Sequence, residues 1–143
     1  MDTRQVRLLL RQVAAGKTPV SAALKELKHL PFADMGFARL DTHRALRTGA
    51  SEVVFCAGKT PKQIVEIFKR FSALKQSVFA TRASPEVFAA VRAELPRARF
   101  YETARIVAAG GFPKTRGRRA VLIVSAGTSD QPVAEEAAVT AEL

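Results

Sequence analysis

The stretch Glu52-Val53-Val54-Phe55-Cys56-Ala57-Gly58-Lys59-Thr60-Pro61-Lys62-Gln63 joins an apolar run to the start of a helix. Glu52–Cys56 reads as a strand, and Thr60 with Gln63 three residues later has the pattern of a capping box, with Pro suited to the first helical position. The helix that follows places four apolar side chains on one face: Ile64, Ile67, Phe68 and Phe71. Ser77–Thr81 is the next strand. We therefore predict two neighbouring parallel strands joined by a helix over residues 60–74.

Outward from this unit, the chain alternates between helical and extended patterns. Expected helices are Thr3–Ala15, a second one from Thr18-Pro19, a turn over Asp41–Arg47, and one capped by Ser84-Pro85. Further strand candidates are Phe37–Leu40, Arg97–Tyr101 and Ala104–Ala108. The fold class is therefore α/β, with amino-terminal helices followed by βα units and a mostly parallel sheet.

The last part of the chain carries the most specific functional pattern. Val121–Ser125 is an apolar run typical of a buried parallel strand, followed by a tight turn over residues 127–130 and a helix opened by Pro132. We expect this strand to be poorly supported in this chain, because its sheet partners would come later in the sequence. A loop that leaves such a strand lies at its carboxyl end, where open α/β sheets bind ligands. Its hydroxyls, backbone N–H groups and helix N-terminus suit a phosphate or carboxylate. The predicted substrate-binding residues are Gly127, Thr128, Ser129 and Asp130.

This last unit also has plainer interpretations. Ser129 and Asp130 could simply cap the following helix. Glu135 and Glu136 stand in that helix's first turn, where stabilising the helix dipole is the more ordinary role for a carboxylate than acid/base catalysis. The Gly110–Arg119 loop is the best candidate boundary, which gives an amino-terminal α/β domain over residues 1–116 and a first βα unit of another domain over residues 117–143.

Bulk composition narrows the class of protein. With 143 residues the chain suits one domain with a core, and no apolar run approaches the length of a membrane span. Cys56 is the single cysteine, so no internal disulfide forms, and a reducing cytoplasm is expected. The net charge of +10 attracts anions, yet Lys114–Arg119 is the one dense basic cluster. This pattern does not favour a nucleic-acid partner, because the cluster has no aromatic interleaving.

Five motifs together resemble one known family. In chain order they are Asp41-Thr42-His43-Arg44, Gly49 with Glu52–Phe55, Gly58-Lys59-Thr60-Pro61, Ala80-Thr81-Arg82, and Ser125–Ala137. The chain resembles the amino-terminal portion of the LarB family, the carboxylases/hydrolases of nickel-pincer cofactor biosynthesis, which are related to PurE, the aminoimidazole ribonucleotide carboxylase. The resemblance covers nearly all of the 143 residues.

The resemblance implies a pyridinium-3,5-biscarboxylic acid mononucleotide synthase. Such an enzyme adds CO2 or bicarbonate to the ring of nicotinic acid adenine dinucleotide and hydrolyses its phosphoanhydride, which releases AMP. It implies that residues 117–143 begin a truncated PurE-like (flavodoxin-like) domain, that the complete enzyme is a homo-oligomer, and that magnesium is a possible cofactor. The family's catalytic cysteine would lie beyond Leu143, so Cys56 is not that nucleophile and this chain alone is expected to be inactive.

The same resemblance bears on the turn and on the other charged residues. PurE-type enzymes usually carry a serine where this chain has Gly127, so backbone contacts to phosphate gain importance. Lys59, Arg44 and Arg82 are possible anion contacts, although a solvated lysine beside a helix start is common. Asp41 could pair with Arg44 or Arg47 at helical spacing. His43 lacks partners at metal-ligand spacing and is read as a capping or surface residue; no metal site and no cofactor bound by this chain are predicted.

Two other function classes stay open on the sequence. The chain could be a non-catalytic assembly or nucleotide-binding module, or, with Lys114–Arg119 as its sole support, a small basic protein that binds nucleic acid.

Overall fold

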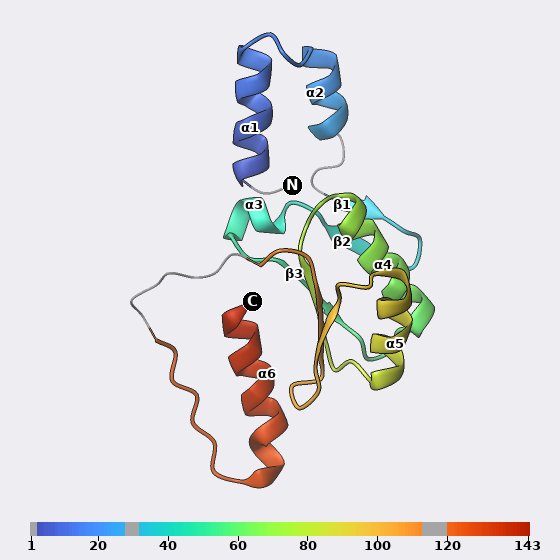
Figure 1. The fold of residues 1–143 in the computed structure, drawn as a ribbon, viewed down its shortest axis with the longest axis vertical. Helices are drawn as coiled ribbons and strands as arrows, with labels where there is room; N and C mark the ends of the chain where they lie inside the picture. The colour runs from blue at the N-terminus through green and yellow to red at the C-terminus, as the bar shows by residue number, and fades with distance from the viewer. Residues whose placement is uncertain (1–2, 28–31, 113–119) are drawn as a thin grey trace.

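The computed structural model describes residues 3–27, 32–112 and 120–143, and it has the α/β architecture that the sequence predicts (Figure 1). In chain order the elements are α1 (Thr3–Ala14), α2 (Val20–Leu27), β1 (Phe32–Asp34), β2 (Arg39–Asp41), α3 (Arg44–Thr48), β3 (Glu52–Phe55), α4 (Pro61–Ala73), β4 (Val78–Thr81), α5 (Pro85–Glu94), β5 (Arg99–Tyr101), β6 (Ile106–Ala109), a 3-10 turn η1 (Thr128–Asp130) and α6 (Gln131–Glu142). Within these residues no helix is both long and apolar enough to cross a membrane.

The central sheet has four strands in the order β3-β4-β6-β5. β3 and β4 are parallel, with Val53 opposite Phe79, so the predicted βαβ unit is confirmed. β6 is antiparallel to both of its neighbours, β4 and β5. Three strands therefore share one direction and β6 runs the other way, which makes the sheet mixed.

Local capping explains where the two helices of this unit begin. The Thr60 hydroxyl accepts from the Gln63 N–H at 3.3 Å, and the Gln63 side-chain oxygen accepts from the Thr60 N–H at 2.9 Å. This reciprocal pair is the predicted capping box. At the start of α5 the Ser84 hydroxyl likewise accepts from the Val87 N–H at 3.3 Å.

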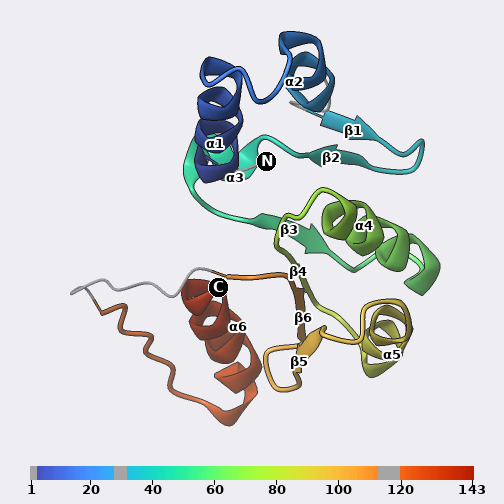
Figure 2. The same ribbon diagram turned by 45° about the horizontal axis from the view of Figure 1, so that its top comes forward.

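Helices cover both faces of the sheet (Figures 1 and 2). On one face α4 and α5 pack together against it, and the four apolar side chains predicted for α4 are at most 1% exposed: Ile64, Ile67, Phe68 and Phe71. On the other face α6 places Val139 in a smaller cluster with Phe79 and Ile106. The main core thus lies under α4 and α5, and the α6 side is thinner.

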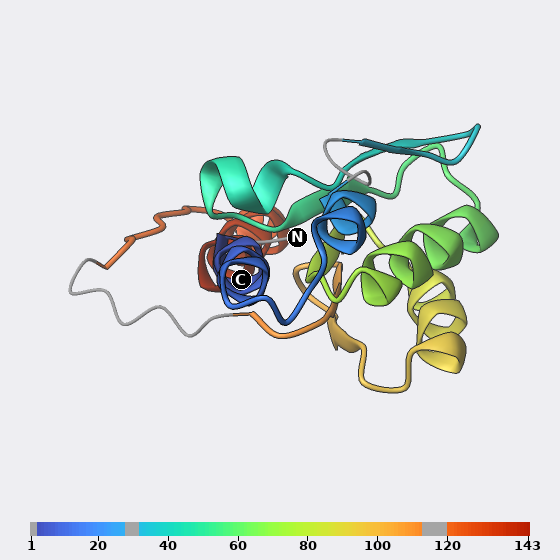
Figure 3. The same ribbon diagram turned by 90° about the horizontal axis from the view of Figure 1, so that it is seen from above.

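The amino-terminal segments form two small units that are separate from the four-stranded sheet. α1 and α2 make a helical hairpin at one end of the molecule (Figures 1 and 3), and β1 pairs with β2 in an antiparallel ribbon. β2 overlaps the strand predicted at Phe37–Leu40 and ends one residue later, at Asp41. β1 was not predicted, because an alternating pattern over three residues is too short to identify a strand.

The Val121–Ser125 segment does not form a strand, in agreement with the expectation that it would be poorly supported in this chain. Residues 120–126 form no strand, and the side chains of Val121, Leu122 and Val124 are 73%, 86% and 82% exposed. A buried parallel strand needs a hydrogen-bonded neighbour, and within the described residues this segment has none. The predicted turn and helix do form, as η1 and α6. The basic cluster at residues 114–119 and the predicted domain boundary at 116/117 both lie outside the described residues.

Candidate functional site

The carboxyl ends of β3, β4 and β5 meet at one edge of the sheet, and the loop that leaves each strand carries a cation. Lys59 follows β3, Arg82 follows β4, and Arg105 lies in the turn between β5 and β6. This edge is where open α/β sheets bind ligands. We call these three residues the basic edge. The exposed carboxylates of Glu86 and Glu102 belong to the same loops or to the helix that follows, so the edge carries both signs of charge.

Backbone hydrogen bonds join the loops of the basic edge. The Cys56 N–H donates to the Thr81 carbonyl at 3.1 Å, and the Ala83 N–H donates to the Arg105 carbonyl at 2.8 Å. Arg82 and Arg105 both adopt left-handed conformations, with φ of 56° and 53°. Such conformations are uncommon for residues with a side chain and often occur at functional sites.

The loop after β3 brings further positive potential. The Lys59 ammonium donates to the Phe55 carbonyl at 2.9 Å, which holds this side chain against its own turn. α4 and α5 both begin at this edge, with Thr60 and Ser84 as their N-caps, so the positive ends of two helix dipoles lie beside the three cations. The three cations and the two helix N-termini are groups that a bound anion can contact.

Cys56 lies beneath the basic edge and is 6% exposed. Burial raises the pKa of its thiol to about 11, although Lys59 and Arg105 act in the opposite direction. At neutral pH the side chain is therefore a protonated thiol and a poor nucleophile.

We expect Cys56 to react at pH 8 at least about tenfold more slowly with a thiol reagent than an exposed cysteine, because only the thiolate reacts. A raised pKa means that the thiolate fraction rises with pH toward about 11. Stopped-flow measurement of thiol modification between pH 7 and 10, with the urea-unfolded chain as control, checks this. Equal rates for the folded and unfolded chain would show that the thiol is accessible and ionised.

α6 connects the predicted substrate-binding turn to this end of the molecule. The Arg82 Nε lies 3.0 Å from the Glu136 carboxylate, and Figures 1 and 2 show α6 beginning at the end where the β5–β6 turn lies. The four residues of the turn, Gly127 to Asp130, are exposed. Neither η1 nor α6 has a side-chain cap hydrogen bond, so capping does not account for Ser129 and Asp130.

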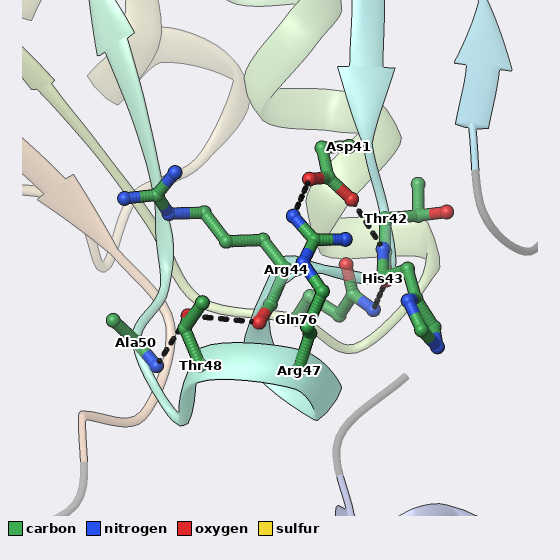
Figure 4. Close-up of polar contacts among 8 residues, drawn as sticks. All are labelled: Asp41, Thr42, His43, Arg44, Arg47, Thr48, Ala50 and Gln76. Atoms are coloured by element: carbon green, nitrogen blue, oxygen red, sulfur yellow. Dashed lines mark hydrogen bonds and ion pairs between the residues drawn. The ribbon is translucent and has the colours of Figure 1, made fainter.

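Arg44 lies at the opposite, amino-terminal end of β3, in a separate polar cluster (Figure 4). There the Asp41 carboxylate pairs with Arg47 at 2.7 Å and accepts from the His43 N–H at 3.0 Å. Burial acts to raise the pKa of Asp41, but these hydrogen bonds outweigh it and the pKa is lowered. The ion pair anticipated for Asp41 thus forms with Arg47. His43 occupies the N-cap of α3 without a side-chain cap bond.

The Arg44 side chain points away from Asp41 in Figure 4. Its Nε and one oxygen of Glu52 are buried without a hydrogen-bond partner among the described residues. Burial raises the pKa of Glu52, and the nearby Arg44 charge opposes that rise. Arg44 is therefore associated with Glu52 and lies apart from Lys59 and Arg82.

Sequence reasoning did not single out Arg105. The expected strand Ala104–Ala108 contains Arg105, whereas in the structure β6 begins at Ile106 and Arg105 lies in the turn before it. Across residues 3–27, 32–112 and 120–143 no cluster of His, Cys, Asp and Glu has the composition of a metal site.

Two hollows in the described surface lie away from the basic edge. One of about 830 Å³ separates the α1–α2 hairpin from the end of α4, and its lining includes Leu8, Lys25 and Arg70. The other, of about 610 Å³, lies at the amino-terminal end of β4 beside Leu95 and Gly110. Neither contains a residue predicted to bind substrate.

Two comparisons with known proteins bear on the family of this chain. A search of curated proteins found no match. A family model described as the LarB/PurE-like N-terminal domain matches residues 32–110, a range that contains the whole four-stranded sheet, α4, α5 and the basic edge. The match covers more than half of the chain and agrees with the motifs, so the chain belongs to the LarB/PurE-like N-terminal domain family.

Proposed function

We propose that this chain is the amino-terminal part of a pyridinium-3,5-biscarboxylic acid mononucleotide synthase and that it binds the phosphates of nicotinic acid adenine dinucleotide. The observation that carries the proposal is the basic edge, which lies inside the matched family domain. Lys59, Arg82 and Arg105 lie where ligands bind in open α/β sheets, and a diphosphate is the part of this substrate that attracts them.

The turn over Gly127 to Asp130 has a complementary role in this proposal. Its exposed hydroxyls and the N-terminus of α6 suit a phosphate, while the Asp130 carboxylate suits ribose hydroxyls that can donate to it. The domain that begins near residue 117 would carry the carboxylation and hydrolysis, with CO2 or bicarbonate as second substrate. Assembly into a homo-oligomer belongs to the same proposal.

One alternative shares the basic edge. A non-catalytic nucleotide-binding or assembly module would use the same cations, and the high pKa of the only cysteine suits that function as well. The two functions differ in their products, because only the synthase releases AMP.

We expect the dinucleotide to bind the 143-residue chain, and Lys59→Gln with Arg82→Gln together to weaken that binding about tenfold, since each partly exposed charge contributes a modest amount. Calorimetric titration measures the affinity. The double variant Arg92→Gln with Arg97→Gln is the matched control: it also removes two positive charges, from exposed positions near and after the end of α5, away from the basic edge. Equal weakening by this double variant would show that net charge alone attracts the ligand.

The same samples, incubated with bicarbonate and analysed by mass spectrometry, separate the function classes. We expect binding without AMP from this chain, and AMP once the catalytic domain is supplied. No binding at all would contradict the proposed substrate contact, and AMP release lost in Cys56→Ser would place the chemistry in this domain.

A further inference from the structure

The Arg82–Glu136 ion pair places a carboxylate at the centre of the basic edge. The Glu136 Oε2 lies 3.0 Å from the Arg82 Nε, and the two side chains are 22% and 43% exposed. A carboxylate oxygen and a phosphate oxygen accept the same charge-assisted hydrogen bond from a guanidinium group. Glu136 therefore occupies the position that an oxyanion would take at Arg82.

The contact between α6 and the sheet is small. Val139 is the one buried residue of α6, and it packs in the cluster that contains Phe79 and Ile106. Glu136, Val139 and Leu143 follow one another at spacings of three and four residues, so they share a helix face. Leu143 and Tyr101 are partly buried against the same cluster. The Arg82–Glu136 pair is the one ion pair between α6 and the rest of the described residues, beside the apolar contacts of Val139 and Leu143.

We propose that Glu136 is an internal competitor for the anion site at Arg82, and that a diphosphate displaces it and loosens α6 from the sheet. The choice of a diphosphate rests on the function proposed above. A diphosphate carries more charge than one carboxylate, and Lys59 and Arg105 follow strands that end at the same edge as Arg82. A partly exposed ion pair contributes little stability, so the exchange has a low cost.

The chain contains a natural reporter for this displacement. Tyr101 is its only tyrosine, and it has no tryptophan. Because Tyr101 packs in the cluster that receives Val139, release of α6 changes the environment of the one strong fluorophore.

The test is a titration of the chain with inorganic pyrophosphate, with affinity from calorimetry and α6 release from Tyr101 fluorescence. We expect Glu136→Gln to bind pyrophosphate roughly three- to tenfold more tightly, as removal of one competing charge from a partly exposed site predicts. Its fluorescence without ligand should already resemble that of the saturated wild-type chain. Arg82→Gln should lose most of the affinity.

Glu135→Gln is the matched control. It removes the same charge from the neighbouring position, which is exposed and has no ion pair within the part of the chain that the structure describes. Tighter binding in Glu136→Gln but not in Glu135→Gln supports the proposal. Equal effects of the two variants, or unchanged Tyr101 fluorescence at saturation, overturn it while leaving the dinucleotide contact of Arg82 intact. Loss of dinucleotide binding in the separate titration would instead contradict the proposed function.

Discussion

Gly110→Ala is expected to lower the free energy of unfolding by about 2–4 kcal/mol, combining backbone strain with overpacking. Gly110 follows β6 with φ of 109°, a conformation that residues with a side chain rarely adopt. A Cβ at this position would lie 2.7 Å from the Ser77 Cα and 3.0 Å from its Cβ. The nearest atom belongs to the backbone, so relief requires β6 and the start of β4 to separate.

The neighbouring glycine provides the control. A Cβ at Gly111 meets no atom within 4 Å, so Gly111→Ala should change the free energy of unfolding by less than about 0.5 kcal/mol. Urea unfolding followed by circular dichroism measures both variants. Similar stabilities for the two alanine variants would mean that β6 does not approach Ser77 as closely as the structure shows.

The parts of the fold that the sequence predicted depend on signals that lie close together in the chain. Two of these features depend on a single helix, α4: its capping box at Thr60 and Gln63, and its apolar face. The structure contains both. The parallel pairing of β3 and β4 follows from a single helix between two strands. All of these features lie within residues 52–81.

The Val121–Ser125 segment shows what such local signals leave out. Its apolar run indicates a preference for burial, but a strand exists only when a neighbour supplies hydrogen bonds. In the described residues that neighbour is absent, and Leu122 is 86% exposed. The direction of β6 was likewise not predicted, because strand order depends on contacts that a one-dimensional pattern does not contain.

The sequence predicted some residues of the candidate site correctly and misplaced another. Lys59 and Arg82 were identified from motifs that follow strands, and the structure places both at the carboxyl edge. Arg44 has the same charge and stands in an equally specific motif, yet it lies at the other end of β3 beside Glu52. A motif shows which residues are distinctive, whereas the position of a residue before or after its strand decides which of them meet.

Ser129→Ala is expected to weaken binding of nicotinic acid adenine dinucleotide roughly ten- to a hundredfold, because losing a hydrogen bond to a charged group costs about 1.5–3 kcal/mol. The hydroxyl stands in an exposed turn and makes no cap hydrogen bond in η1 or α6. Its removal should therefore change the free energy of unfolding by less than about 0.5 kcal/mol. A helix cap would instead lose about 1 kcal/mol.

A substitution at Gly127, in the same turn, distinguishes an effect on ligand binding from an effect on folding. Its φ of −119° is ordinary, and an added Cβ would meet the Ser129 hydroxyl at 3.4 Å, so the free chain tolerates a side chain there. Gly127→Val should nevertheless weaken dinucleotide binding more than Ser129→Ala, since a branched side chain blocks close approach of a phosphate to the backbone. Calorimetric titration and urea unfolding of both variants, with Ser72→Ala as an exposed serine control on α4, give the two quantities. Unchanged affinity with lowered stability in Ser129→Ala would assign this turn a structural role and remove it from the binding site.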